Sequence, residues 1–253
     1  MFTTGHLLIG AVAAIVIGLS KSAIPGGGLL ATPLLALVVS GRLIAGTTLP
    51  LLLIADVIAV SWFGHHARRD VLTPLIRSVA VGFAFGTTFY VVVGGGGRTL
   101  DVVLGTSIVV LVVLQLIRLV RRSAAVKSTP ALAAAVGVTG GFTTFVANAA
   151  GPIMNTYLVG IGLPKDELIG TTAWFYFGVN AAKIPVYLAI GKWARGGPFF
   201  TASSLGYDAA LAPVVIASLF VGRALLARIA QQTFTIVVLV LAAIAAVKLL
   251  VGF

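Results

Sequence analysis

The sequence predicts an all-α integral membrane protein made of two homologous halves. Of its 253 residues, 59% are hydrophobic and only 9% are charged, whereas a soluble domain carries roughly 25% charged residues. Apolar runs long enough for a membrane-spanning helix, which takes about 20 residues, recur along the whole chain. Each half opens with one such run that is interrupted, and the two interruptions fall at matching places.

The charge pattern favours a membrane location over nucleic-acid binding. The net charge is +11, but Lys and Arg gather in short loops such as "HHARRD" (65–70) and "RLVRRSAAVK" (118–127). Such loops are typical of the cytoplasmic side of a membrane protein, so we expect a multi-pass protein of the cell (inner) membrane. There are no cysteines, which excludes disulfides and thiolate sites. His65 and His66 lack a third ligand of the right type nearby, so we expect no metal and no cofactor.

Two of the apolar segments are too short to cross a bilayer alone. These are 29–40 and 150–162, and each follows a longer segment after a break, "KSAIPGGG" (21–28) or "VANAAG" (146–151). The remaining segments are long enough to span, and they cover 5–20, 43–63, 74–93, 99–120, 131–147, 167–190, 205–225 and 233–252.

The two halves resemble each other in sequence. "GLSKSAIPGGGLLATPLLALVVSGRLIAGTT" is echoed by "GFTTFVANAAGPIMNTYLVGIGLPKDELIGTT". Gly28 falls opposite Gly151, and an offset larger by one residue places Asp56 opposite Asn180. We therefore expect a first repeat at 1–120, a basic cytoplasmic linker at 121–129 and a second repeat at 130–253. Each repeat would be a broken, re-entrant helical hairpin followed by three transmembrane helices.

We expect the repeats to be inverted, because interrupted helices at matching positions in inverted repeats recur in secondary transporters and mark their binding sites. The basic residues in the loops of the second half fit the inverted and the non-inverted arrangement equally well. The charges therefore leave the orientation of the second half open. Inversion would bring the two breaks together near the middle of the membrane.

The breaks themselves suggest an anion site. Non-helical backbone at membrane depth is tolerated only in a protein interior or beside a water-filled cavity, and a helix that restarts there offers free N–H groups and a positive dipole end. The residues concerned are Gly26, Gly27, Gly28, Asn148 and Gly151. Close helix packing by small residues is the alternative reading of the glycines.

Three of the ionisable residues in or beside apolar segments are candidates for the site. Lys183 lies well inside one of them, where a lysine costs about 3 kcal/mol and needs a cavity or a partner; Asn180 is one turn away. Lys183 either binds an anion or pairs with Asp56, and Asp56 either relays protons or is merely a counter-ion. Lys21, beside the first break, either attracts an anion or extends to the membrane interface.

The repeated "GTT" supplies Thr47, Thr48, Thr171 and Thr172 near helix starts. Their hydroxyls either line a polar path, for which we single out Thr171, or cap helices and bond to their own backbone.

These motifs resemble the TauE/SafE family of membrane permeases, also called the sulfite exporter family. The best-matching stretches are "GGGLLATPLLAL" (26–37), "GTTLPLLLIAD" (46–56), "AGPIMNTYLVGIGLPKDELIGTTAWFYFGVNAAK" (150–183) and the final "SLFVGRALLARIAQQTFTIVVLVLAAIAAVKLLV". The resemblance covers nearly the whole chain. It implies a small transporter for sulfur-containing anions, with a site on the two breaks and with Asn180 and Lys183 nearby.

We therefore expect a secondary transporter, an exporter of small sulfur-containing or other organic or inorganic anions of the sulfite or sulfonate type. Its partners would be the anion and the lipid bilayer, with protons coupled through Asp56. An anion channel is the alternative, and an intramembrane lipid-phosphate enzyme is a weaker one, because no catalytic grouping of residues is present. The sequence leaves open the identity of the anion, the coupling ion, the direction of transport and whether the protein forms a homo-oligomer.

Overall fold

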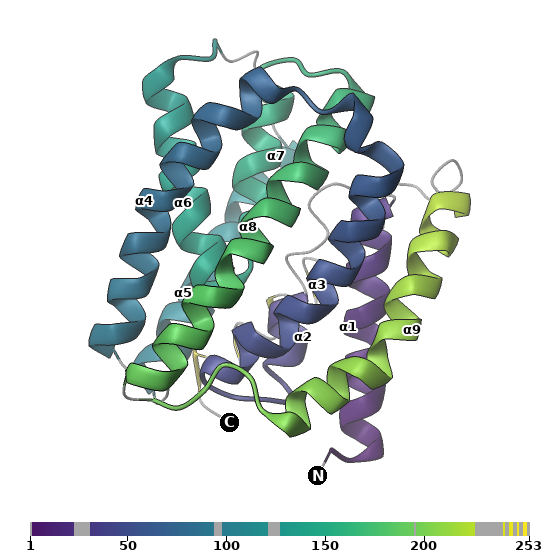
Figure 1. Ribbon diagram of the computed structural model, residues 1–253, viewed down its shortest axis with the longest axis vertical. Coiled ribbons are helices and arrows are strands. Elements are labelled where there is room, and N and C mark those ends of the chain that lie inside the picture. The colour runs from purple at the N-terminus through teal and green to yellow at the C-terminus, as the bar shows by residue number, and fades with distance from the viewer. Residues whose placement is uncertain are drawn as a thin grey trace.

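The computed structural model is all-helical in the part of the chain that it describes (Figure 1). That part comprises residues 2–22, 31–93, 98–120, 127–194 and 196–225, with isolated positions between 240 and 251. Most of the first predicted break, with Gly26, Gly27 and Gly28, lies outside the described residues. So do most of the predicted linker and most of the predicted last span.

The helices follow the predicted segments closely. The first half of the chain forms α1 (Thr4–Ser22), α2 (Ala31–Leu35), α3 (Arg42–Phe63), α4 (Arg69–Val93) and α5 (Arg98–Val120), with one 3₁₀ turn at Gly64–His66 between α3 and α4. The second half forms α6 (Pro130–Ala147), α7 (Gly151–Gly160), α8 (Lys165–Trp193) and α9 (Ala202–Leu225). Five of these helices, namely α1, α3, α4, α6 and α9, are long and apolar enough to cross a membrane. The prediction of a multi-pass membrane protein is thus confirmed.

The second predicted break is present. Helix α6 ends at Ala147, and Asn148 adopts a left-handed backbone conformation with a φ of 53°. Asparagine tolerates this region better than most residues because its short polar side chain bonds locally. Helix α7 then starts at Gly151 with Pro152 in its first turn, where the missing N–H of proline costs nothing. With 10 residues, α7 is about 15 Å long and too short to span.

Small residues bring α4 and α6 into close contact. A methyl group added at Gly82 would overlap the Val138 carbonyl oxygen and would lie 2.7 Å from the Phe142 nitrogen. A methyl group at Gly137 would likewise lie 2.8 Å from the Leu75 carbonyl oxygen. Contacts advance along both helices together, so α4 and α6 run parallel, and glycines at these places let the two backbones approach.

The same kind of interface joins α1 and α9. An added methyl at Gly18 would overlap Ser218 and lie 2.7 Å from the Val215 carbonyl oxygen, and one at Gly222 would overlap Ser22. These helices also run parallel, because Gly18 meets the middle of α9 and Ser22 meets its end. Each of the two tightest helix pairs therefore joins one helix of the first half to one helix of the second half.

Helices α3 and α8 lie at the centre and run in opposite directions. In Figure 1, α3 rises toward the turn that leads to α4, whereas α8 descends from the connection that follows α7. The contacts agree, since Trp174 near the start of α8 donates to the Gly64 carbonyl at 3.1 Å, just beyond the end of α3. Farther along α8, Asn180 meets Asp56 in the body of α3.

Arginines fix both ends of this central pair. Arg42, which is 1% exposed, donates to the Tyr90 carbonyl at 2.6 Å and to the Gly197 carbonyl at 3.2 Å. It therefore ties the start of α3 to the last turn of α4 and to the connection after α8. At the other end, exposed Arg68 pairs with Asp70 at 2.7 Å and with Glu167 at 3.0 Å.

Candidate functional site

The first part of the site is a buried ion pair between α1 and α3. Lys21 Nζ lies 2.6 Å from Asp56 Oδ1, and Asn180 Nδ2 donates to Asp56 Oδ2 at 2.6 Å. Asp56 is fully buried and Asn180 is 2% exposed. Lys21 Nζ also lies 3.9 Å from the centre of the Tyr176 ring, a favourable cation–π distance. Lys21 therefore turns inward, and the alternative in which it extends to the membrane interface is wrong.

The second part is Lys183 on α8, which is fully buried. Its Nζ donates to the Thr144 carbonyl at 3.1 Å, to Thr144 Oγ1 at 3.1 Å and to Asn148 Oδ1 at 2.5 Å. These three acceptors match the three donors of an ammonium group, and all of them are neutral. Lys183 is therefore not the direct partner of Asp56, although it lies within electrostatic range of both Asp56 and Lys21.

Asn148 connects the second break to both central helices. Its Oδ1 accepts from Lys183 on α8, and its Nδ2 donates to the Ala45 carbonyl on α3 at 3.3 Å. Its backbone N–H closes α6 by donating to the Thr144 carbonyl at 3.0 Å. The residue that forms the break therefore also holds the position of the buried lysine.

The cluster has more basic groups than acidic ones. Two amines and one carboxyl group would leave one net positive charge with all three ionised, and the described residues bring no second carboxylate to Lys183. Burial of an uncompensated charge is costly and disfavours the charged form, so an anion bound beside Lys183 would stabilise its ammonium form.

The other predicted site residues lie as follows. Gly151 is the first residue of α7 and sits next to the break. Thr171 is fully buried, but its Oγ1 accepts from the Arg68 backbone N–H at 2.9 Å. It is 12 residues before Lys183, which is about 18 Å along a helix, so the structure does not bring Thr171 together with Lys183.

The remaining threonines of the repeated "GTT" separate into two kinds. Thr48 and Thr172 donate to carbonyls of their own helices at 2.6 Å and 2.9 Å, which is the capping and back-bonding interpretation. Thr47 is fully buried and has no hydrogen-bond partner.

Two residues of the site, Thr144 and Tyr176, were not predicted as site residues, although the sequence contains a signal for each. Thr144 holds Lys183, and the offset of the repeats, 144 − 21 = 123, makes it the counterpart of Lys21. Tyr176 contacts Lys21 and lies on α8 one turn before Asn180, a spacing that places two residues on one helix face. Within the described ranges, no three His, Asp or Glu side chains come together as a metal site.

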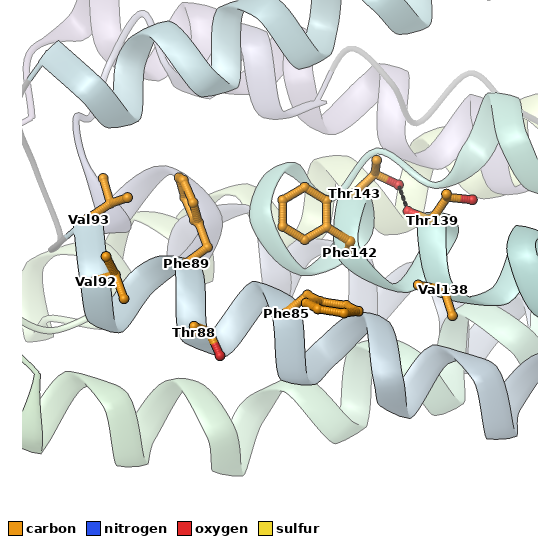
Figure 2. A pocket seen from close by; sticks show the side chains of 9 residues that line it. All are labelled: Phe85, Thr88, Phe89, Val92, Val93, Val138, Thr139, Phe142 and Thr143. Atoms are coloured by element: carbon orange, nitrogen blue, oxygen red, sulfur yellow. Dashed lines mark hydrogen bonds between the residues drawn. The ribbon is translucent and has the colours of Figure 1, made fainter.

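A separate open groove lies between α4 and α6 and has a volume of about 570 Å³ (Figure 2). Its walls are apolar apart from Thr88, Thr139 and Thr143, and each of these hydroxyls donates to a carbonyl of its own helix. No charged residue lines it, so it offers an anion no favourable contact. The buried lysine cluster is the better candidate site.

Comparisons with known proteins agree with this picture. No curated protein and no solved structure matches the chain. The family model described as "Sulfite exporter TauE/SafE" matches residues 10–249, which include every helix from α2 to α9 and most of α1. Members of this family are membrane transporters and not enzymes. The chain therefore belongs to the TauE/SafE sulfite exporter family.

Proposed function

We propose that the protein is a secondary transporter of the cell (inner) membrane that exports small sulfur-containing or other organic or inorganic anions, of the sulfite or sulfonate type. One observation supports the preference of the site for an anion. Lys183 is fully buried, and each of its hydrogen bonds goes to a neutral acceptor. An anion is the ligand that supplies the missing counter-charge.

The second break adds a further attraction for an anion. Helix α7 starts at Gly151, three residues after Asn148, which accepts from Lys183. The first N–H groups of a helix have no partner within the helix, and its dipole is positive at that end. The proposed binding residues are Lys21, Asn148, Gly151, Asn180 and Lys183. Gly26, Gly27 and Gly28 are the corresponding residues of the first break, and Thr171 stays a proposal for the polar path.

Several arrangements support two inverted halves as the basis of the mechanism. The counterpart helices α3 and α8 run antiparallel, and the counterpart residues Asp56 and Asn180 contact each other. Replacing each helix by its counterpart in the other half also turns the close pair α4 and α6 into the close pair α9 and α1. Inverted repeats give a transporter two related conformations, open to opposite sides around one site.

The packing suggests which parts move during alternating access. The two tight pairs, α1 with α9 and α4 with α6, each draw one helix from each half, and they would form the cores of two rigid units. The central helices α3 and α8 contact each other between these pairs. Lys21 belongs to the first unit, whereas Thr144, which accepts from Lys183, belongs to the second. The site would therefore lie between the two units.

Proton coupling is a separate part of the proposal. Asp56 is the acid through which protons would couple, but its 2.6 Å contact with Lys21 also fits a role as a fixed counter-charge. Transport by purified protein in liposomes, with and without a pH gradient, distinguishes the two roles. A gradient-driven flux that Asp56→Asn removes would support the relay role.

The central test is sulfite and sulfonate counterflow in liposomes. Lys183→Met should abolish it, because the anion loses its counter-charge, whereas Lys192→Met is the matched control at the exposed end of the same helix. Normal counterflow in Lys183→Met would remove Lys183 from the site. A steady anion conductance in a planar bilayer, without counterflow, would replace the carrier by a channel.

A further inference from the structure

Two buried side chains at matching positions have no hydrogen-bond partner among the described residues. Asn155 on α7 is 1% exposed, and neither its Oδ1 nor its Nδ2 is bonded. Thr32 on α2 is also 1% exposed, and its Oγ1 is unbonded. The two residues are repeat counterparts, since 155 − 32 = 123 equals the offset 151 − 28 = 123 between Gly151 and Gly28.

Unpartnered groups of this kind are unusual in a folded protein. Leaving a buried donor or acceptor unsatisfied costs about 1–3 kcal/mol, and most buried polar side-chain atoms have a partner. Thr48 and Thr156 avoid the cost by donating to their own helix at 2.6 Å, whereas Thr47 is, like Thr32, unbonded among the described residues. Asn155 leaves both ends of its amide unused.

Helix geometry directs Asn155 toward the break. The Cα–Cβ bonds of a helix tilt toward its N-terminus, so a side chain covers the turn that precedes it. Asn155 lies one turn after Gly151, the first residue of the ten-residue helix α7. Its amide therefore lies over the first turn of α7, next to the break whose other end, Asn148, accepts from Lys183.

We propose that Asn155, together with Thr32 from the matching helix, selects the transported anion by a hydrogen-bond donor that the anion carries. This inference rests on the proposed function. An oxyanion satisfies the N–H groups of Asn155 but leaves its Oδ1 unbonded, because an oxyanion only accepts. A substrate with both an oxyanion and a hydroxyl or similar donor satisfies both ends of the amide, and the Thr32 hydroxyl can donate to the anion as well.

A matched pair of sulfonates tests the inference. The purified protein is titrated calorimetrically with 2-hydroxyethanesulfonate and with ethanesulfonate, which differ in one hydroxyl group. We expect the hydroxylated anion to bind about tenfold more tightly, the value of one hydrogen bond of about 1.4 kcal/mol. Asn155→Leu should bring the ratio of the two dissociation constants close to one while ethanesulfonate still binds. Thr156→Ala is the control on the same helix and should keep the ratio.

The possible results separate this inference from the proposed function. If both sulfonates bind equally to the unaltered protein, the inference is wrong and the proposed function stands. If neither binds and neither is transported, the proposed function fails and the inference fails with it. Thermal melting without ligand gives an independent check, because Asn155→Leu removes an unsatisfied amide and should leave the melting temperature equal or higher. A clear fall, seen again in Asn155→Ala, would show that Asn155 serves a structural contact and would overturn the inference.

Discussion

The buried pair of Lys21 and Asp56 allows a quantitative test of the site. The two charges lie 2.6 Å apart, with side-chain exposures of 11% and 0%. At an effective dielectric constant of about 20, unit charges at this distance attract by about 6 kcal/mol. Much of that attraction offsets desolvation, and removal of one partner of a buried pair typically costs about 3–5 kcal/mol because the other charge stays buried.

We therefore expect both single variants to be strongly destabilised. Lys21→Met leaves the Asp56 carboxylate with only the Asn180 amide, and its cost should fall near about 3 kcal/mol. Asp56→Asn should cost more, because Lys21 and Lys183 then share the interior with no acid from the described residues near them. The double variant should recover most of the loss, which corresponds to a coupling energy of about 2 kcal/mol or more.

The measurement is reversible unfolding of the purified protein in detergent micelles, with the four proteins of the cycle compared under one condition. Arg68→Gln serves as the reference for an exposed pair, since Arg68 is 47% exposed, and its effect on stability should be much smaller. Costs that add within about 0.5 kcal/mol would mean that the two residues act independently. That result would refute the ion pair and the charge argument built on it.

Three further outcomes follow from the packing and from the second break. Gly82→Ala should cost about 1–3 kcal/mol in the same unfolding measurement, because its methyl group overlaps the Val138 carbonyl. The control Gly178→Ala, with no atom within 4 Å of the added methyl, should be neutral or stabilising by up to about 1 kcal/mol. Equal costs of the two substitutions would contradict the close α4–α6 interface. Asn148→Ala should be less stable than Asn148→Gly by about 1 kcal/mol, because only glycine accepts the left-handed conformation without strain, and the opposite order would show that this backbone conformation is not fixed. Arg42→Met should lower the unfolding free energy by about 2–3 kcal/mol, since the Tyr90 carbonyl is buried and loses a charged donor. An unchanged melting temperature would show that Arg42 does not hold α3 to α4.

The fold was largely predictable because its signals are local. The length of the apolar runs indicates the spans. The end of α6 and the start of α7 follow from "VANAAGP", which contains an asparagine that tolerates the left-handed region and then a first-turn proline. The shortness of α7 also follows from the length of its apolar run. These features depend on a few neighbouring residues, so they do not require knowledge of the tertiary packing.

The partners of the lysines were not predictable, because they depend on how each helix is rotated about its axis and on the depth in the membrane at which it ends. Lys21 closes α1, and a lysine at a helix end ordinarily reaches the membrane surface. Here α1 ends beside α3, so that Asp56 is the nearest counter-charge. For Lys183 the sequence offered Asp56 as the partner, whereas the break presents Thr144 and Asn148 to the same ammonium group. Helical periodicity assigns residues to a face but does not say which neighbouring helix that face meets.

The comparison of counterpart residues explains how the two proposed repeats come to differ in charge. Asp56 and Asn180 occupy matching positions and contact each other, so the two halves meet where one carries an acid and the other a neutral amide. The first half also carries Lys21, which neutralises that acid, whereas its counterpart Thr144 is uncharged. The second half carries Lys183 one turn farther along, where the first half has Ala59. The two proposed repeats therefore differ in charge, and the lysine without an acidic hydrogen-bond partner lies beside the break at which we place the anion.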